Sequence, residues 1–523
     1  MTGPLLFGAL TLSALVAVAA TVPGDGDVDR LRAAAVAAIA RARATAQKSG
    51  SVVAREVTLP SIERLVEDAD LRRASPTVPQ RDEAFVRETL KTARAYADRV
   101  AAGQDPYRTA TGRMVKAYRA DWDGTLQPYA LYVPRDYDAR KAWPLVVALH
   151  GAYSNPLNNL RRVFGLNNRP GESDDEAARN LLPLPDVPAL VVCPSGRGGL
   201  MGYDGLGGED VMRVIADVRR AYNIDPERMT LTGLSMGGGA TWAIGLRHPE
   251  MFAALAPICG MTDFRPWIPA GDEALYDLPR LEQMSPLAIA ENAAHMQVMI
   301  FHGADDPTVP VQNSRRMAER YRALGWLGKN VTYTEYPGVH HDAWALAYKD
   351  AALLRRLIGI RRDPAAPRTP LSPPPPGEAI PGLFGKSLPR QHPHIYVYGT
   401  HGSPEAVAAA RALALALADW GPMVDAKFTV KADRDVTPDD LARFKLVLIG
   451  APPLNELAPS LLGEPELGDD AYRANMADLR HPGHESLTFG ALTPRGFERL
   501  RRFAVPNRDH FAPESNLMFV RFH

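Results

Sequence analysis

Residues 228–242 read Arg-Met-Thr-Leu-Thr-Gly-Leu-Ser-Met-Gly-Gly-Gly-Ala-Thr-Trp, and the five residues at 233–237 fit the pattern G-x-S-x-G. A short apolar run precedes this pattern and a helix-like run follows it. A serine hydroxyl attacks a carbonyl well only when it is held on a sharp turn at the end of a strand, within reach of a base. The neighbouring glycines permit strained backbone at Ser235 and let strand and helix approach closely. The stretch therefore predicts a nucleophile elbow, and its strand and helix context distinguishes it from a chance match in a Gly-rich chain.

Apolar runs that suit buried strands alternate with helical patterns on both sides of this stretch. The expected strands are 114–120 and 129–133, which form an opening hairpin, followed by 143–151, 189–194, 252–258, 298–301 and 331–336. The expected helices are 209–222, 240–247, 311–324 and 344–358. Such alternation implies a mostly parallel sheet covered on both faces, with the active site at the carboxyl ends of the strands. The predicted fold class is therefore α/β, with a doubly wound, mostly parallel sheet.

A catalytic serine needs a base, and the base needs an orienting acid, in the chain order Ser…Asp…His for this architecture. The segment 302–310, His-Gly-Ala-Asp-Asp-Pro-Thr-Val-Pro, directly follows an expected strand. For the acid we prefer Asp306 to its neighbour Asp305, although either aspartate also suits a turn. Asp263, which follows the preceding strand, is a third candidate.

The base is expected after the last strand, in 337–344, Pro-Gly-Val-His-His-Asp-Ala-Trp. Of its two adjacent histidines we prefer His341 to His340. The predicted catalytic residues are then Ser235, Asp306 and His341.

The oxyanion hole should consist of backbone N–H groups, because these donors are fixed before negative charge develops. One donor is the N–H of Met236, directly after the nucleophile. The other is expected in the loop that His150-Gly151 opens, at Ala152 or Tyr153.

Neither a cofactor nor a metal is expected. The segment 196–208 holds seven glycines, but it has no G-x-G-x-x-G or P-loop spacing. Residues 340–342, His-His-Asp, are adjacent and point apart, which disfavours a metal site. The two cysteines, Cys193 and Cys259, stand at the ends of separate expected strands, so two buried thiols are predicted rather than a disulfide.

Length and composition restrict the protein class. With 523 residues, two or three domains are expected, and the 46% hydrophobic and 23% charged fractions are those of a globular protein. Because 60 basic residues balance 60 acidic ones, no net charge favours nucleic acid or an anionic membrane. A polyanionic partner is therefore not expected.

The N-terminus suggests export. Residues 1–20 contain an apolar run that ends in small residues, with Ala17-Val18-Ala19 as a cleavage signature, and they predict a signal peptide. The run is shorter than a usual membrane span, so no stable membrane span is expected. No Lys or Arg precedes the run, and a buried N-terminal helix is the alternative. The predicted location is secreted or periplasmic.

Composition shifts divide the rest of the chain. Residues 27–110 predict a helical N-terminal region that packs on, or partly covers, the catalytic domain at 111–360. Residues 361–390 form a Pro-rich linker, with eight prolines between 361 and 381. Residues 391–523 are expected to form a second, small α/β domain of unknown role.

Several segments together look like the α/β-hydrolase superfamily. They are 129–134, 149–151, 233–238, 302–310 and 341–344, and the resemblance covers about 114–360. Within the superfamily the chain resembles polyhydroxybutyrate-depolymerase and feruloyl or acetylxylan esterase-like enzymes, which overlap with the prolyl-oligopeptidase catalytic domain.

The resemblance implies Ser235 as nucleophile, Asp306 as acid and His341 as base. One departure is His340-His341, where such enzymes often have Gly-His. Another is the short helical region before the first strand, which leaves no room for the β-propeller of a gated oligopeptidase.

Three functions follow from these patterns and from the resemblance, and for the first of them the expected partner is a small-molecule or polymer-borne ester substrate. The first is a secreted serine hydrolase that cleaves carboxylic esters through an acyl-enzyme, without a cofactor. The second is a serine peptidase of the prolyl-oligopeptidase family, either an exopeptidase or an oligopeptidase. The third is a binding module with a vestigial site.

Overall fold

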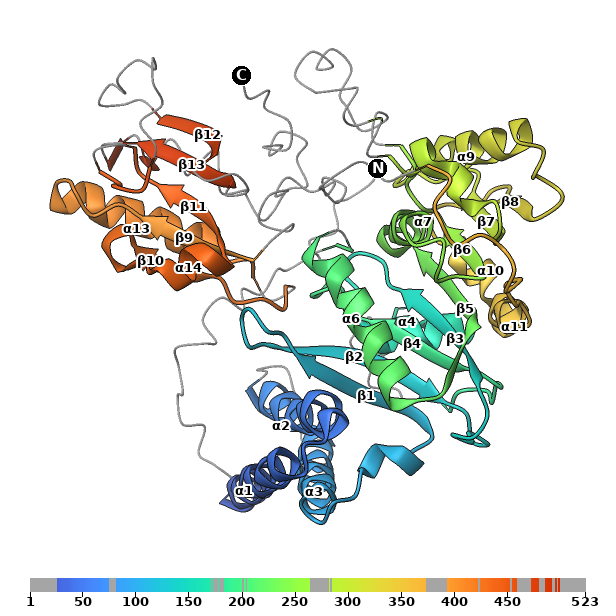
Figure 1. Cartoon of the computed structure of the whole chain (residues 1–523), viewed down its shortest axis with the longest axis horizontal. Coiled ribbons are helices and arrows are strands. Elements are labelled where there is room, and N and C mark those ends of the chain that lie inside the picture. The colour runs from blue at the N-terminus through green and yellow to red at the C-terminus, as the bar shows by residue number, and fades with distance from the viewer. Residues whose placement is uncertain are drawn as a thin grey trace.

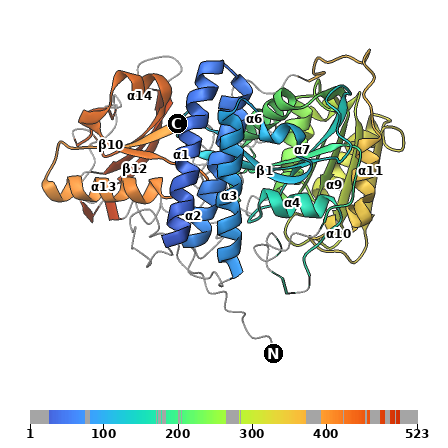
Figure 2. The same ribbon diagram turned by 90° about the horizontal axis from the view of Figure 1, so that it is seen from below.

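The computed structural model describes residues 26–74, 81–169, 171–172, 177, 183–199, 202–203, 205–263, 282, 285–372, 393–421, 424–451, 454–458, 472–478, 485–491, 494–495 and 497–498. Figure 1 and Figure 2 show three bodies, which are a helical region, a large α/β domain and a smaller α/β domain. The predicted signal peptide at 1–20 lies outside the described residues. No helix in the described ranges is long and apolar enough to cross a membrane.

The large domain is built on an eight-stranded sheet in the order β1-β2-β4-β3-β5-β6-β7-β8. Its strands are β1 (Gly112–Arg119), β2 (Leu126–Val133), β3 (Trp143–Leu149), β4 (Leu190–Pro194), β5 (Ile224–Leu234), β6 (Ala254–Ile258), β7 (Gln297–Gly303) and β8 (Val331–Tyr336). The strand β2 is antiparallel to both of its neighbours, and all later pairs are parallel. This is the strand order of the α/β-hydrolase fold, and it confirms the predicted fold class.

Register brings the carboxyl ends of the parallel strands to one edge. Leu149 at the end of β3 pairs with Gly233 of β5, and Leu234 pairs with Ile258 of β6. On the other side, Gly303 of β7 pairs with Tyr336 at the end of β8. The loops that follow these strands therefore meet at the same edge, where the sequence predicts the site.

Helices cover both faces of this sheet. They are α4 (Pro156–Val163), α6 (Leu206–Ala221), α7 (Met236–Arg247), the 3₁₀ helix η5 (Pro286–Ala293), α9 (Gln312–Ala323), α10 (Trp344–Ala347) and α11 (Ala352–Ile358). In β3, Leu145 and Val147 belong to one buried apolar cluster, while Val146 and Ala148 belong to another. This alternation follows from the two-residue period of a strand and gives the domain a core on each face.

Two local predictions for this domain were wrong. In the segment 154–188, where no helix was expected, the structure has α4, whose cap residue Asn155 accepts the N–H of Asn158. The single helix expected at 344–358 is broken, because Asp350 and Ala351 have left-handed backbones with φ of 53° and 55°.

The helical region comprises α1 (Gly26–Ser49), the π-helix η1 (Ala54–Thr58), α2 (Leu59–Ala74) and α3 (Arg81–Ala101). Figure 2 shows α1, α2 and α3 side by side. Small and aliphatic residues such as Ala35, Ile62 and Leu90 form their shared core. The region contacts β1, where the Ser61 hydroxyl donates to the Ala117 carbonyl at 3.2 Å. The strand β1 is one edge of the sheet and β8 is the other. A contact with β1 therefore fits simple packing on the domain better than a cover over the site.

The smaller domain carries a sheet in the order β10-β9-β11-β13-β12. Its elements are β9 (His394–Tyr398), α13 (Pro404–Ala418), β10 (Thr429–Ala432), α14 (Pro438–Arg443), β11 (Lys445–Ile449), β12 (Tyr472–Asp478) and β13 (Glu485–Ala491). The pairs among β10, β9, β11 and β13 are parallel. A second small α/β domain was expected, but β10, α14, β12 and β13 were not.

The segment expected as the first part of the linker packs on the large domain. The Arg362 N–H donates to the Glu227 carbonyl at 2.8 Å, and the Ser372 N–H donates to the Asn292 side chain at 2.7 Å. Residues 361–372 therefore belong structurally to the catalytic domain, while 373–392 lie outside the described residues.

Candidate active site

Ser235 stands on the turn between β5 and α7. Its φ of 55° and ψ of −117° are strained for a residue with a side chain. The turn packs so closely that only glycine fits on either side of the serine. A Cβ atom on Gly233 would lie 2.3 Å from the Gly237 carbonyl oxygen. A Cβ atom on Gly237 would in turn lie 2.2 Å from the Leu149 carbonyl oxygen. The half-buried serine side chain is thereby held at the carboxyl edge of the sheet.

The structure brings Ser235, His341 and Asp306 together in one hydrogen-bonded chain. The Nε2 atom of His341 lies 2.8 Å from the Ser235 Oγ atom. The Nδ1 atom lies 2.7 Å from Asp306 Oδ2. Since a carboxylate only accepts, Nδ1 carries the hydrogen, and Nε2 is left to accept from the serine hydroxyl. This arrangement can remove a proton from Ser235 as it attacks.

Backbone N–H groups hold the carboxylate of Asp306 in place. Its Oδ1 accepts the N–H groups of Thr308 at 2.8 Å and Val309 at 2.9 Å. Burial acts to raise the pKa of this carboxyl, but hydrogen bonds from His302 and His341 outweigh it and hold the pKa well below its usual range. The group is therefore a carboxylate at any neutral pH, and it favours a hydrogen on the facing nitrogen of His341.

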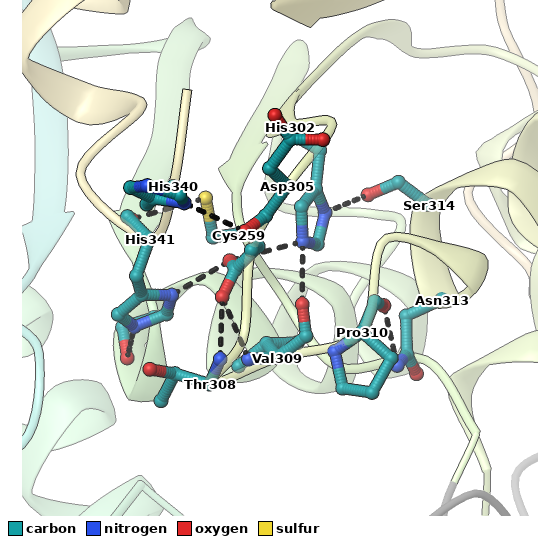
Figure 3. A network of polar contacts seen from close by, with 12 residues as sticks. Cys259, His302, Asp305, Thr308, Val309, Pro310, Asn313, Ser314, His340 and His341 are labelled. Atoms are coloured by element: carbon teal, nitrogen blue, oxygen red, sulfur yellow. Dashed lines mark hydrogen bonds and ion pairs between the residues drawn. The ribbon is translucent and has the colours of Figure 1, made fainter. Parts of the chain in front are cut away.

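A second histidine supports the same carboxylate. His302 is fully buried, and its Nε2 lies 2.9 Å from the Val309 carbonyl oxygen and 3.3 Å from Asp306 Oδ2. Its Nδ1 lies 2.6 Å from the Ser314 hydroxyl. Figure 3 shows His302 and His341 approaching one carboxylate from opposite sides. Sequence reasoning did not assign His302 a role, although the His-Gly pair that ends β7 was the available signal.

Cys259 lies behind the base. Its Sγ is 3.4 Å from the His341 carbonyl oxygen, and its backbone has a left-handed φ of 48°. Burial raises the pKa of this thiol to about 12, so it stays protonated. Cys193 is also buried and free. The prediction of two separate thiols is confirmed, because β3 and β5 lie between their strands.

The less favoured candidates have other partners. Nδ1 of His340 lies 2.8 Å from the Asp305 carbonyl oxygen. The carboxylate of Asp263 pairs with Arg316 at 2.5 Å. The geometry thus favours Asp306 and His341 over each alternative weighed in the sequence.

The expected oxyanion turn lies against the nucleophile. A Cβ atom on Gly151 would be 3.5 Å from that of Ser235. The N–H of Tyr153 donates to the Gly199 carbonyl at 2.9 Å, so it is already occupied. Among the described residues, the N–H of Ala152 has no hydrogen-bond partner, and neither has that of Met236 at the first position of α7. Of the two positions left open for the second donor, the geometry favours Ala152.

Within the described part of the chain, two groups of side chains have donor atoms close enough for a metal ion. One is Cys259, Asp306 and His341, which the serine network already uses. The other is His401, Asp433 and Glu456 in the smaller domain. There Asp433 already accepts Thr400 Oγ1 and N and the Arg434 and Glu456 N–H groups, which leaves its oxygens little capacity for a cation.

Known proteins match the catalytic domain. The family model described as the prolyl oligopeptidase family matches residues 206–357. A probable feruloyl esterase C of Aspergillus oryzae is 26% identical over 219 residues, which are 40% of this chain and 66% of that protein. A poly(3-hydroxyalkanoate) depolymerase C of Paucimonas lemoignei is 26% identical over 123 residues, or 21% of this chain and 28% of that protein. Among solved structures, a thermostable esterase is 26% identical, with a TM-score of 0.34, over 48% of this chain and 63% of that one.

This chain thus spans 66% of the length of the feruloyl esterase and 28% of that of the depolymerase. The family match begins at α6 and ends within α11, and it includes Ser235, Asp306 and His341. The chain therefore has the α/β-hydrolase fold and is similar to the prolyl oligopeptidase family and to feruloyl esterases.

Proposed function

We propose that the protein hydrolyses carboxylic esters through an acyl-enzyme on Ser235. The observation that carries the proposal is the chain of hydrogen bonds of 2.8 Å from Ser235 to His341 and 2.7 Å from His341 to Asp306. The feruloyl esterase and depolymerase among its relatives support an ester as substrate.

In the proposed reaction, His341 Nε2 takes the proton from Ser235 Oγ while Oγ attacks the carbonyl carbon. The N–H groups of Met236 and Ala152 bind the oxyanion as it forms. The imidazolium then protonates the leaving alcohol, and the C–O bond of the ester breaks. Water, deprotonated by His341, attacks the acyl-enzyme and releases the acid. Asp306 stays ionised throughout and keeps the imidazole in place.

A peptidase on the same three residues is the second candidate, because the family match is to the prolyl oligopeptidase family. Esters need less help with the leaving group than amides do, so a substrate pair with one chromophore distinguishes the two activities. We would measure hydrolysis of p-nitrophenyl acetate and of an aminoacyl p-nitroanilide.

Wild type and Ser235→Ala are compared on both substrates. Loss of the nucleophile should lower kcat by about four to six orders of magnitude. Fast ester turnover that Ser235→Ala abolishes, with slow anilide turnover, is the expected result. Comparable anilide turnover would favour the peptidase. No Ser235-dependent turnover and no labelling by a fluorophosphonate would reject both and leave the binding module.

We also propose that the protein is exported and acts on small or polymer-borne esters. The apolar run within residues 1–20 supports export. Mass spectrometry of the mature N-terminus tests it, since an uncleaved N-terminus in the cell fraction would contradict export.

A further inference from the structure

The smaller domain meets the catalytic domain through residues 424–428, which we name the docking segment. Val424 is buried together with Leu206 at the start of α6. Phe428 places its ring 5.6 Å from that of Trp122, in the β1–β2 hairpin. Figure 1 shows the two domains approaching each other at this end of the hairpin.

Asp425 makes the polar contacts of the docking segment. Its N–H donates to the Arg197 carbonyl at 2.9 Å, and its own carbonyl accepts from Gln127 Nε2 at 2.7 Å. Its carboxylate accepts the Ser195 hydroxyl at 3.4 Å. The residues Ser195 and Arg197 belong to the loop that follows β4, at the carboxyl edge where the site lies.

This loop, residues 195–199, needs support from its surroundings. Arg197 has a left-handed φ of 65°, which a non-glycine residue keeps only where neighbouring groups impose it. Its guanidinium forms a buried ion pair with Asp123 at 3.0 Å. The same carboxylate accepts the N–H of Lys427, from the docking segment, at 3.2 Å. The docking segment therefore contacts both the strained residue and the group that holds it.

The other side of the loop holds the oxyanion turn. The Ser195 carbonyl oxygen lies 2.9 Å from His150 Nε2. The Gly199 carbonyl accepts the N–H of Tyr153, whose φ of 61° is also left-handed. The two carbonyl groups thus contact His150 and Tyr153, the residues on either side of the turn that contains Ala152.

We propose that the smaller domain positions the oxyanion turn of the catalytic domain, with Asp425 and Ser195 as positioning residues. The contacts run from the Asp425 carboxylate to the Ser195 hydroxyl, and from the Ser195 and Gly199 carbonyls to the turn at 150–153. The inference rests on the proposed function, because the turn matters only if Ser235 attacks a carbonyl. Its consequence is that the smaller domain influences kcat, although Ser235, Asp306 and His341 all belong to the catalytic domain.

The size of the effect follows from oxyanion chemistry. Removal of one oxyanion donor costs about a hundredfold to a thousandfold in kcat, and a donor that is misplaced costs part of that. We therefore expect Asp425→Ala and Ser195→Ala each to lower kcat on p-nitrophenyl acetate by about tenfold to a hundredfold. KM should change by less than about threefold, because the ground-state carbonyl gains little from the hole.

The phosphonylation rate with a fluorophosphonate should fall in parallel, since its phosphoryl oxygen enters the same hole. Asp425→Asn keeps an oxygen that accepts the Ser195 hydroxyl, and it should restore most of the rate. The Ser195 hydroxyl also accepts the N–H of Gly198 at 3.0 Å, so Ser195→Ala removes two contacts and Asp425→Ala one of them. The double variant Asp425→Ala/Ser195→Ala should therefore lose no more activity than Ser195→Ala alone.

The matched control is Asp439→Ala, the same substitution at an exposed position of α14 that pairs with Arg443 in the same helix. It should leave kcat unchanged. Near-UV circular dichroism shows whether each variant is folded, and Ser195→Ala decides the case if Asp425→Ala is not.

A folded Asp425→Ala enzyme with wild-type kcat and phosphonylation rate would overturn the inference. So would multiplied losses in the double variant, or an equal loss in Asp439→Ala. Failure of the proposed function looks different, because wild-type turnover would then not depend on Ser235 at all.

Discussion

Ser235 and Ser403 occupy equivalent places in the two α/β domains, each between a parallel strand and a helix. Ser403 directly precedes α13, and its hydroxyl accepts the N–H of Ala406 at 3.2 Å. Ser235 directly precedes α7, and its hydroxyl makes no bond to that helix. Instead it lies 2.8 Å from His341. One serine caps a helix and the other faces a base.

The backbone explains the difference. Ser403 has an extended backbone with φ of −64° and ψ of 151°, which directs its side chain to the free N–H groups of the helix. Ser235, with φ of 55°, turns its side chain away from them. The comparison teaches that the strained turn, rather than a position between a strand and a helix, directs the Ser235 hydroxyl to His341.

The base gives the largest test of this comparison. His341→Ala should lower kcat on p-nitrophenyl acetate by about four to six orders of magnitude, because among the described residues His341 is the group placed to accept the Ser235 proton. His340→Ala is the matched control and should retain kcat within about threefold, since a surface contact is all it loses. A large loss in His340→Ala with activity left in His341→Ala would reverse the assignment of the base.

The acid gives the next largest effect. Asp306→Asn keeps the size of the side chain but can donate to the imidazole, which would place the hydrogen on the wrong nitrogen, and kcat should fall by about two to four orders of magnitude. Asp305→Asn changes the adjacent residue in the same way and should have little effect. Equal losses in the two variants would mean that the loop, rather than the carboxylate, is responsible.

Ser403→Ala tests the other half of the comparison. Loss of a helix cap should lower the free energy of unfolding of the smaller domain by about 1 kcal/mol, while ester turnover is kept. Thermal unfolding and kcat are both measured. If Ser403→Ala abolished ester turnover, the two serines would not differ in the way described.

Acid pH gives the smallest expected effect. Burial acts to raise the pKa of Asp440 in α14, but hydrogen bonds from Lys431 and Thr437 lower it to about 2. An unfolded aspartate titrates near about 3.9, so this carboxylate stabilises the fold fully above that pH and loses its contribution as the pH falls through the lower value. The difference in Tm between wild type and Asp440→Asn should therefore shrink between about pH 5 and pH 2. A difference in Tm that stayed constant with pH would show that folding does not lower the pKa of Asp440.

Local pattern and chain order were sufficient to predict the fold and to propose the site residues. Apolar runs marked every strand of the large sheet, and the rule that sites lie at strand ends led to Asp306 and His341. Sequence reasoning missed contacts that depend on distant packing, such as the one between Asp425 and Ser195, which are 230 residues apart. It also missed the break at Asp350, because helical periodicity continues across it. Strands β12 and β13 of the smaller sheet lie in a part of the sequence with too little periodicity to predict them.

The docking segment and the loop at 195–199 belong to one chain, so they meet at a local concentration in the millimolar range rather than at the concentration of the protein. A few hydrogen bonds and a small apolar cluster are therefore sufficient to keep the two domains together. The same contacts would be too weak between separate polypeptides at micromolar concentration. Proteolysis between the two domains would thus weaken the support of the oxyanion turn by dilution, with every catalytic residue intact.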